Sequence, residues 1–365
     1  MISGIVMRKI KLVVSDLHIS KGRTLEDGSP NLLEDFYYDR EFIDFLGWFS
    51  SEEYRKYDVE IIFNGDFLNT LQVDLRESFP EIITENMAVE KVKSIIRGHP
   101  ELFEALKSFA ATPNHEITVI TGNHDPAFLW PTVRDFFASF LETEVRYPLT
   151  QYRFDGFHIE HGNQHTVVNA YETKKLFLHD GLDEPILNLP FGSLFVIKFL
   201  NKVKQRRGYA DKVRPLRKYL MGSLLNDPLF GWPSVFRLAW FLIASRLRKK
   251  YLTGPEMLKT WKILVEGFRF TPDLENAARK VLFANPDVHT VLMGHTHRAM
   301  HRRFRADKEY FNTGTWNDTI YLDIENLGRS RKLTFAMIEY NDKDRPRAKL
   351  MEWRGLARPF LQVEY

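Results

Sequence analysis

The sequence predicts an α/β fold in which two β-sheets form a sandwich flanked by helices. Three observations support this prediction. Short apolar runs of strand length alternate with segments of helical periodicity. Five of these runs end at a cluster of polar residues, and ligands of α/β folds bind beyond the carboxyl ends of strands. After residue 300 the pattern changes to consecutive strand-like segments separated by turns.

The five runs are rich in β-branched and aromatic residues, as buried strands are. They cover residues 10–14, 59–63, 117–121, 157–160 and 288–293. Apolar residues at three- and four-residue spacing predict helices over 39–56, 87–111 and 131–142. A second, more antiparallel sheet is expected from segments 309–313, 318–324, 333–340 and 348–354.

The division into domains follows from where this alternation stops. Residues 165–285 are mostly helical in pattern and repeatedly interrupted by proline. We therefore expect a core formed by residues 1–164 and 286–365, with residues 165–285 inserted as a cap. Within 198–250 the chain has 14 basic and two acidic residues, a net charge of +12. Because the whole chain carries +3, the remainder carries −9.

Composition excludes several classes of site. The chain has no cysteine, which rules out disulfides, zinc–thiolate sites and cysteine nucleophiles, and fits a cytoplasmic protein. The N-terminal residues lack a basic region followed by an apolar core, so no signal peptide is expected. No uninterrupted apolar run reaches 18 residues, so no membrane-spanning helix is expected.

The polar clusters after the five runs contain residues that bind divalent cations. Carboxylate oxygen, imidazole nitrogen and amide oxygen are their usual ligands. The candidates are Asp16, His18, Asp66, Asn123, His161, His295 and His297. A single such residue is more often a structural turn residue, but seven of them exceed the needs of one ion. Two ions sharing one carboxylate would use them all, as in sites for phosphoryl displacement.

The order DLH, GDFLN, GNHD, HG and GHTH resembles the calcineurin-like metallophosphoesterase superfamily, whose motifs are D-x-H, GD-x-x-D, GNH-D/E, H and GH-x-H. The resemblance covers 10–162 and 286–315. It implies a metallophosphoesterase-type sandwich with a helical cap between the fourth and fifth motifs. It also implies one metal ion held by Asp16, His18 and His297, a second held by Asn123, His161 and His295, and Asp66 bridging the two.

The resemblance further implies hydrolysis of a phosphoester by a hydroxide bridging two divalent ions. Manganese is favoured, and iron and zinc also suit these ligands. His124 is implied to face the phosphate and to stabilise or protonate the leaving oxygen, which makes His124 and Asp66 the catalytic candidates. Candidate substrate-binding residues are Asn123, His165 and Arg298.

One position departs from the family pattern. The last aspartate of the second motif is Asn69 here, and an amide adds no negative charge beside the catalytic imidazole. We therefore expect a lowered pKa for His124, or assistance from Asp125 instead.

The cap contains apolar, aromatic segments with basic residues, at 191–207 and 233–252. They are expected either to pack within the cap or to lie on an anionic membrane surface through residues 186–252. The cap and its place in the motif order are similar, in part, to bacterial UDP-2,3-diacylglucosamine pyrophosphatases, whose cap holds acyl chains. This similarity predicts a lipid-linked substrate and a peripheral location at the inner membrane face.

Two alternatives remain open. The +12 cap would also suit a nuclease acting on DNA or RNA, although its aromatic stretches favour lipid over nucleic acid. A non-catalytic metal-binding scaffold is the second alternative, and the presence of all seven ligands and of His124 argues against it. The preference for monoester, diester or pyrophosphate and the oligomeric state are left open.

Overall fold

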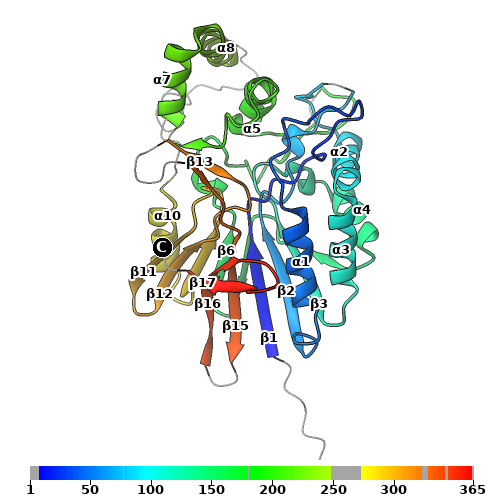
Figure 1. Cartoon of the computed structure of the whole chain (residues 1–365), viewed down its shortest axis with the longest axis vertical. Coiled ribbons are helices and arrows are strands. Elements are labelled where there is room, and N and C mark those ends of the chain that lie inside the picture. The colour runs from blue at the N-terminus through cyan, green and yellow to red at the C-terminus, as the bar shows by residue number, and fades with distance from the viewer. Residues whose placement is uncertain are drawn as a thin grey trace, which may run out of the picture.

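The computed structural model describes residues 8–76, 78–179, 181–214, 216–247, 273–322, 328–341 and 344–363. Two large sheets pack face to face, and helices cover their outer faces (Figure 1). The predicted two-sheet α/β sandwich flanked by helices is confirmed. The division at residues 165 and 285 into core and cap stays a prediction.

The first sheet has seven strands in the order β17-β16-β15-β1-β2-β3-β4. Its parallel half comprises β1 (Arg8–Val14), β2 (Tyr57–Asn64), β3 (His115–Ile120) and β4 (Val145–Arg146). Its antiparallel half comprises β15 (Thr334–Asn341), β16 (Asp344–Trp353) and β17 (Phe360–Gln362). The two halves meet where β15 pairs with β1.

The second sheet has five strands in the order β11-β12-β10-β6-β5. They are β5 (Gln151–Phe154), β6 (Phe157–Glu160), β10 (Thr290–Met293), β11 (Met300–Arg305) and β12 (Lys308–Asn312). The expectation that the segments after residue 300 form this sheet together is wrong, because β15 and β16 join the first sheet. Two smaller sheets pair β14 (Gly328–Ser330), β13 (Thr319–Tyr321) and β9 (Val213–Arg214), and β7 (Phe177–Leu178) with β8 (Ile186–Leu187).

Three buried apolar clusters hold the layers together. The largest lies between the first sheet and the helices α1 (Asp39–Phe49), α2 (Glu85–Gly98), α3 (Pro100–Ala110) and α4 (Pro131–Leu141). The second lies between the two sheets and joins Val13 and Ile62 to Leu292 and Phe311. The third packs α10 (Leu274–Ala284) on the second sheet.

The helix expected over 87–111 is two helices. Pro100 has no backbone N–H and disfavours the helical conformation at the residue before it. His99 accordingly has φ −136° and ψ 55°, so α2 ends before it and α3 begins after it. The helix expected over 39–56 is shorter than predicted, since α1 ends at Phe49 and turns follow.

The segment after residue 165 contributes α5 (Phe191–Phe195), η4 (Val196–Leu200), α6 (Asn201–Lys204), α7 (Leu216–Asn226) and α8 (Pro228–Leu247). Val196 and Ile197 join the largest apolar cluster, whereas α7 and α8 lie at the far end of the molecule (Figure 1). Residues 248–252 of the predicted membrane-binding segment lie outside the described residues. Across the part of the chain that the structure describes, no helix combines the length with the apolar character that crossing a bilayer requires.

Candidate metal centre

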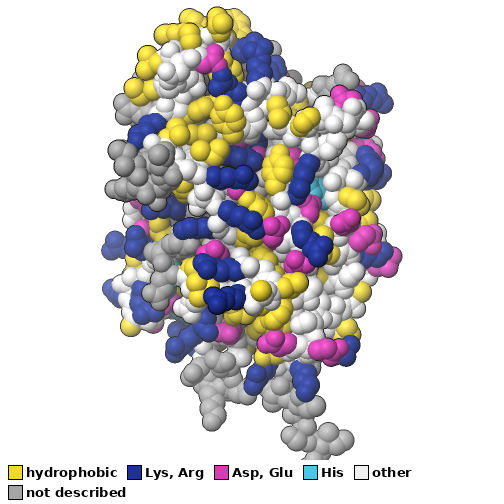
Figure 2. Space-filling view, viewed as in Figure 1, with side chains coloured by type: hydrophobic (Ala, Val, Ile, Leu, Met, Phe, Trp, Pro, Cys, Tyr) yellow, Lys and Arg dark blue, Asp and Glu magenta, His cyan; other side chains and the backbone are white. Residues whose placement is uncertain are grey.

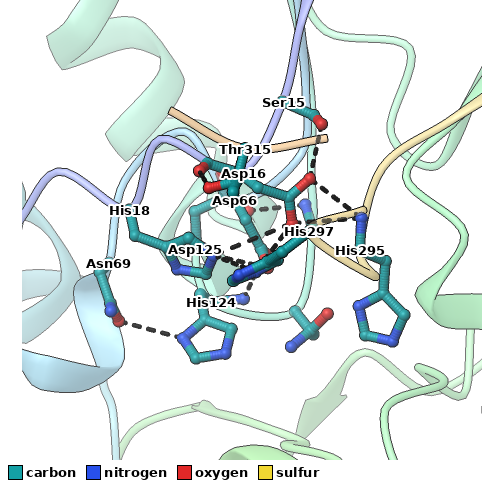
Figure 3. A network of polar contacts seen from close by, with 12 residues as sticks. Ser15, Asp16, His18, Asp66, Asn69, His124, Asp125, His295, His297 and Thr315 are labelled. Atoms are coloured by element: carbon teal, nitrogen blue, oxygen red, sulfur yellow. Dashed lines mark hydrogen bonds and ion pairs between the residues drawn. The ribbon is translucent and has the colours of Figure 1, made fainter. Parts of the chain in front are cut away.

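The clusters that follow β1, β2, β3, β6 and β10 meet beyond the carboxyl ends of these strands, as predicted (Figure 3). One group of potential ligand atoms comes from Asp16, His18 and His297, which lie within 4.8 Å of one another. His18 Nε2 and His297 Nε2 are 3.0 Å apart, and His297 Nε2 is 3.3 Å from Asp16 Oδ1. This group matches the first predicted ligand set.

A second group comes from Asp66, His161 and His295, again within 4.8 Å. Asp66 Oδ2 lies 3.2 Å from His161 Nε2 and 3.6 Å from His18 Nε2, so this carboxylate stands between the two groups. One nitrogen of His124 also lies within 4.8 Å of ligand atoms of His18 and Asp66. The geometry therefore allows two ions with Asp66 between them.

The hydrogen bonds of these residues fit divalent cations. His161 Nδ1 is 2.9 Å from the Asn64 carbonyl, which can only accept, so Nδ1 carries the proton. Asn123 Oδ1 is buried without a hydrogen-bond partner, and His161 Nε2 makes no well-aligned hydrogen bond although Asp66 Oδ2 lies 3.2 Å away. Buried polar atoms rarely stay unpaired, and a histidine whose other nitrogen donates to a carbonyl is the usual arrangement of a metal ligand.

The electrostatics of the group also favour positive charge. Burial opposes protonation of His161, but the carboxylates of Asp66 and Asp16 raise its pKa to about 10. The pKa of Asp66 itself lies well below its usual range despite burial, because the neighbouring histidines stabilise the carboxylate. The cluster thus holds two buried carboxylates that attract cations.

Extended strand geometry does not align the ligand pairs separated by one residue, Asp16 with His18 and His295 with His297. The φ angles of Asp16, His18, Asp66, His295 and His297 are 54°, 52°, 51°, 68° and 57°. Residues other than glycine rarely adopt this left-handed conformation, which costs energy and occurs preferentially at functional sites. The side chains converge because the backbone is bent at each of them.

Hydrogen bonds from one loop stabilise this backbone. Thr315 Oγ1 donates to the Asp16 carbonyl at 2.7 Å, and Asn317 Nδ2 donates to the Leu17 carbonyl at 3.0 Å. The His295 N–H donates to Asp16 Oδ2 at 2.9 Å, which joins the first and last motifs. The roles of Thr315 and Asn317 were not predicted, and their position just after β12 was the only available signal.

Glycines provide space beside the carboxylate between the groups. A Cβ added to Gly122 would collide with the Asp66 carboxylate and backbone nitrogen. A Cβ added to Gly65, whose φ is 78°, would collide with the His161 ring. Both positions therefore exclude larger residues because of close approach, and Gly65 also has a conformation that favours glycine.

His124 lies beside Asp66, with its backbone N–H donating to Asp66 Oδ1 at 2.8 Å. Its Nδ1 is 3.2 Å from Asn69 Oδ1 (Figure 3). Burial lowers the pKa of His124 to about 3, partly offset by the Asp66 carboxylate. The direction agrees with the expectation drawn from Asn69, although burial is its main cause.

Asp125 does not replace the missing carboxylate. Its Oδ1 accepts from the Gly122 N–H at 2.6 Å, and its Oδ2 accepts from the Phe67 N–H at 2.9 Å. Burial raises the pKa of this carboxyl to about 7, and the nearby Asp66 carboxylate contributes. The suggestion that Asp125 assists His124 is therefore wrong, because both of its oxygens stabilise the backbone of neighbouring loops.

The other candidates lie at the margin of the cluster. His165 Nε2 is 2.8 Å from Glu160 Oε1, and Arg298 is exposed. Asn123 is buried beside the ligand groups. Their roles in substrate binding stay predictions. Sequence reasoning missed Thr166, whose Oγ1 lies 3.3 Å from His295 Nε2; no local pattern marks it.

Comparison with known proteins agrees with the motifs. The family model described as calcineurin-like phosphoesterase matches residues 11–299. None of the curated proteins matches. Among solved structures, a dimetal phosphatase from Danio rerio aligns over 98% of each chain at 9% identity, with a TM-score of 0.39. Since the family match spans most of the chain, the chain belongs to the calcineurin-like phosphoesterase family of metal-dependent phosphoester hydrolases.

Proposed function

We propose that the cluster hydrolyses its phosphoester at two divalent ions, manganese being favoured, that share Asp66. The observation that supports this most is the position of Asp66 Oδ2, 3.6 Å from His18 Nε2 and 3.2 Å from His161 Nε2. Bound there, two ions would supply Lewis acidity and activate the attacking water. Asp16, His18 and His297 would hold one ion, and Asn123, His161 and His295 the other.

His124 supplies the remaining chemistry in this proposal. Its backbone is anchored to Asp66, so its ring is held beside the point where phosphorus would bind. The ring holds or moves the proton at the leaving oxygen, which is a general-acid role. Asn123, His165 and Arg298 are proposed to contact the phosphate or its substituent.

The test is hydrolysis of diphenyl phosphate, whose leaving oxygen needs a proton, after metal removal and reloading with Mn²⁺, Fe²⁺ or Zn²⁺. His124→Ala should keep its bound metal and lower turnover about 10²- to 10⁴-fold. His179→Ala removes an exposed histidine and serves as the matched control. A native protein that binds metal but shows no turnover with any of the three ions would support the scaffold alternative.

We further propose a lipid-linked phosphoester or pyrophosphate as substrate, similar to UDP-diacylglucosamine. Support comes from the end of the molecule formed by α7 and α8, where hydrophobic side chains gather next to Lys and Arg (Figure 2). The exposed apolar residues there are Met221, Leu225, Leu229, Trp232, Phe236 and Trp240. Exposed apolar groups flanked by basic ones are typical of interfacial membrane binding. The proposal therefore includes a cytoplasmic location at the inner membrane face.

Flotation with anionic phosphatidylglycerol vesicles and neutral phosphatidylcholine vesicles tests the surface. The native chain should float with anionic vesicles, and the double substitution Leu229→Ser with Trp240→Ser should abolish flotation. Ile82→Ser with Leu356→Ser removes two other exposed apolar residues, which lie elsewhere, and should have no effect. Binding to a DNA duplex that falls steeply with salt, without vesicle binding, would favour the nuclease alternative.

A diacylated sugar–nucleotide pyrophosphate and its deacylated analogue test the substrate. The acylated compound should be hydrolysed faster, and the advantage should disappear in the α8 double variant. Equal rates for the two compounds in the native protein would contradict the lipid proposal while leaving phosphoester hydrolysis intact.

A further inference from the structure

A buried lysine of the inserted segment lies at the end of a hydrogen-bonded chain that reaches His124. Lys204, the last residue of α6, has a fully buried side chain. Its Nζ lies 2.6 Å from Asp35 Oδ2, 2.7 Å from Asp211 Oδ2 and 3.1 Å from Gln72 Oε1. Burial alone would lower the pKa of Lys204, but the ion pairs with Asp211 and Asp35 raise it, so the group is an ammonium that can only donate.

The ammonium determines the orientation of the Gln72 amide. Since Lys204 cannot accept, the group of Gln72 that faces it must be the carbonyl oxygen. Gln72 is fully buried, and its amide nitrogen has no hydrogen-bond partner. The opposite orientation would place that NH₂ group against the ammonium, so that two donors would face each other. The observed orientation of the amide therefore has the lower free energy.

The orientation of the Gln72 amide determines the orientation of the Asn69 amide. Gln72 Oε1 also lies 2.7 Å from Asn69 Nδ2, which must therefore be the donating end of the Asn69 amide. Asn69 Oδ1 is then the atom that faces His124 Nδ1 at 3.2 Å. Because a carbonyl oxygen only accepts, His124 Nδ1 must carry a hydrogen. The nitrogen left for substrate is Nε2.

The backbone of this turn is held from two sides. Asn201, also in α6, donates from Nδ2 to the Leu71 carbonyl at 2.9 Å. The buried Lys91 Nζ donates to the carbonyls of Thr70 and Val73 at 2.9 and 2.5 Å. Thr70 in turn donates its N–H to the His124 carbonyl at 2.9 Å. Little freedom remains for Asn69 and Gln72 to exchange partners.

We propose that Lys204 and Gln72 are positioning residues that act through Asn69 to keep one hydrogen of His124 on Nδ1. A proton that the ring takes up from water then sits on Nε2, is given from there to the leaving oxygen, and leaves the neutral ring with its hydrogen on Nδ1. This rests on the proposed function only in assigning His124 to the leaving oxygen. Where the family pattern has a carboxylate at the position of Asn69, this chain uses an oriented amide whose direction is set by a charge in the inserted segment.

Gln72→Met interrupts the hydrogen-bonded connection between Lys204 and Asn69 while keeping the Lys204 ion pairs. The methionine side chain fills a volume similar to that of glutamine. Gln72→Glu is the conservative rescue, because a carboxylate accepts from both Lys204 and Asn69. Lys212→Met is the matched control. Lys212 lies 3.2 Å from Asp35 Oδ1, and the structure places no contact between its side chain and Gln72. Lys204→Met serves as a second variant.

The first readout is ¹⁵N NMR of the histidine rings in the full chain with Zn²⁺, which is diamagnetic; the signal lost in His124→Gln identifies His124. The native ring and the Gln72→Glu and Lys212→Met rings should carry the hydrogen on Nδ1. Gln72→Met and Lys204→Met should show a mixture of tautomers. A native His124 with its hydrogen on Nε2 overturns the proposal, whether or not any variant folds.

The second readout is the dependence of turnover on the leaving group. Gln72→Met should slow hydrolysis of a phenyl diester about tenfold or more, and change p-nitrophenyl diester hydrolysis and KM little, because only the poorer leaving group needs a proton. A folded Gln72→Met variant with native tautomer and native leaving-group dependence overturns the proposal. Absence of turnover in the native protein would instead contradict the proposed function, while the NMR result still decides the tautomer.

Discussion

The strand-end cluster and the helical segment within residues 165–247 reach the same region of the molecule by different means. The cluster is formed by short motifs directly after strands, with a left-handed backbone at five of the seven predicted ligands. The helical segment contributes single side chains that are far from the cluster in sequence. Ser193 Oγ donates to the Asn123 carbonyl at 3.3 Å, and Lys204 Nζ donates to Gln72 Oε1. At the far end of the helical segment Leu229 is 88% exposed.

We infer from this difference that the cluster performs the chemistry, whereas the helical segment positions residues of the cluster. In the cluster, residues depend on one another through a shared carboxylate, so a change at one of them should affect all. Residues of the helical segment either act on the cluster through intervening residues or do not affect it. The following predictions test this contrast, beginning with the largest effect.

Asp66→Asn should be the most damaging single substitution. It removes the negative charge between the two ligand groups while preserving side-chain volume, so both sites lose affinity together. We expect turnover to fall at least about 10³-fold, equivalent to about 4 kcal/mol of transition-state stabilisation. Metal content per chain and kcat measured on the same preparation check this. Asp135→Asn, an exposed change on α4, is the control, and retention of two ions with full activity would contradict the bridging role.

Gly122→Ala should act through the same carboxylate. The added methyl group collides with Asp66, which must move, and we expect turnover to fall about 10²-fold. Gly47→Ala in α1 has open space around its new Cβ and should leave turnover unchanged while slightly stabilising the helix. Near-native activity of Gly122→Ala would show that Asp66 has room to shift without consequence.

Much of the cluster could be predicted from sequence because its motifs are local. Each ligand lies within a few residues of a strand end, and such ends meet at one side of a layered fold. The membership of β6 and β10 in the second sheet could not be predicted, because buried strands of either sheet have the same apolar pattern. Nor could the left-handed backbone at His18, since histidine is enriched at positive φ but still adopts negative φ in most cases.

The connection between Lys204 and His124 lay beyond sequence reasoning for a different reason. Lys204 contacts Gln72 across 132 residues and Asp35 across 169 residues, distances at which no local periodicity operates. In the sequence, Lys204 is one of many basic residues in 198–250, and its burial distinguishes it from the others whose side chains the structure describes. Of the two residues between Lys204 and His124, the motif comparison marked Asn69 but not Gln72.

Stability should depend on pH in the core through His99. Although burial opposes its charged form, the carboxylates of Asp39 and Glu34 raise the pKa of His99 to about 9. The unfolded-state pKa is about 6.5, so this contribution is fully present below pH 6.5 and is lost as pH rises through about 9. We expect the contribution of His99 to the free energy of unfolding to fall by about 2 kcal/mol between pH 6.5 and 9.5, seen as the difference between the native chain and His99→Gln.

Urea unfolding at the two pH values measures this fall, which His99→Gln should largely remove. His115→Gln is the control. Burial lowers the pKa of His115 to about 4, so it is neutral in both states above pH 6.5. The Lys204 ion pairs contribute little to the change in stability between pH 6.5 and 9.5. The ordinary pKa of a lysine already lies above this range, and the ion pairs raise the pKa of Lys204 further. An undiminished fall in His99→Gln would assign the dependence to other groups.

The smallest effect on the free energy of unfolding is expected for substitutions on α8. The helical segment should have one part that packs on the core and another that is exposed. Phe236 and Trp240 are 67% and 68% exposed, so Phe236→Ser with Trp240→Ser should change the free energy of unfolding by less than about 0.5 kcal/mol per site. Ile197 is 2% exposed and packs in the largest apolar cluster, so Ile197→Ala should cost about 2–5 kcal/mol. Turnover of bis-p-nitrophenyl phosphate should stay native in the α8 variant, since this small substrate needs no contact there. A large loss of stability in that variant would mean that these side chains pack within the cap, and the surface proposed for lipid would then be an internal contact.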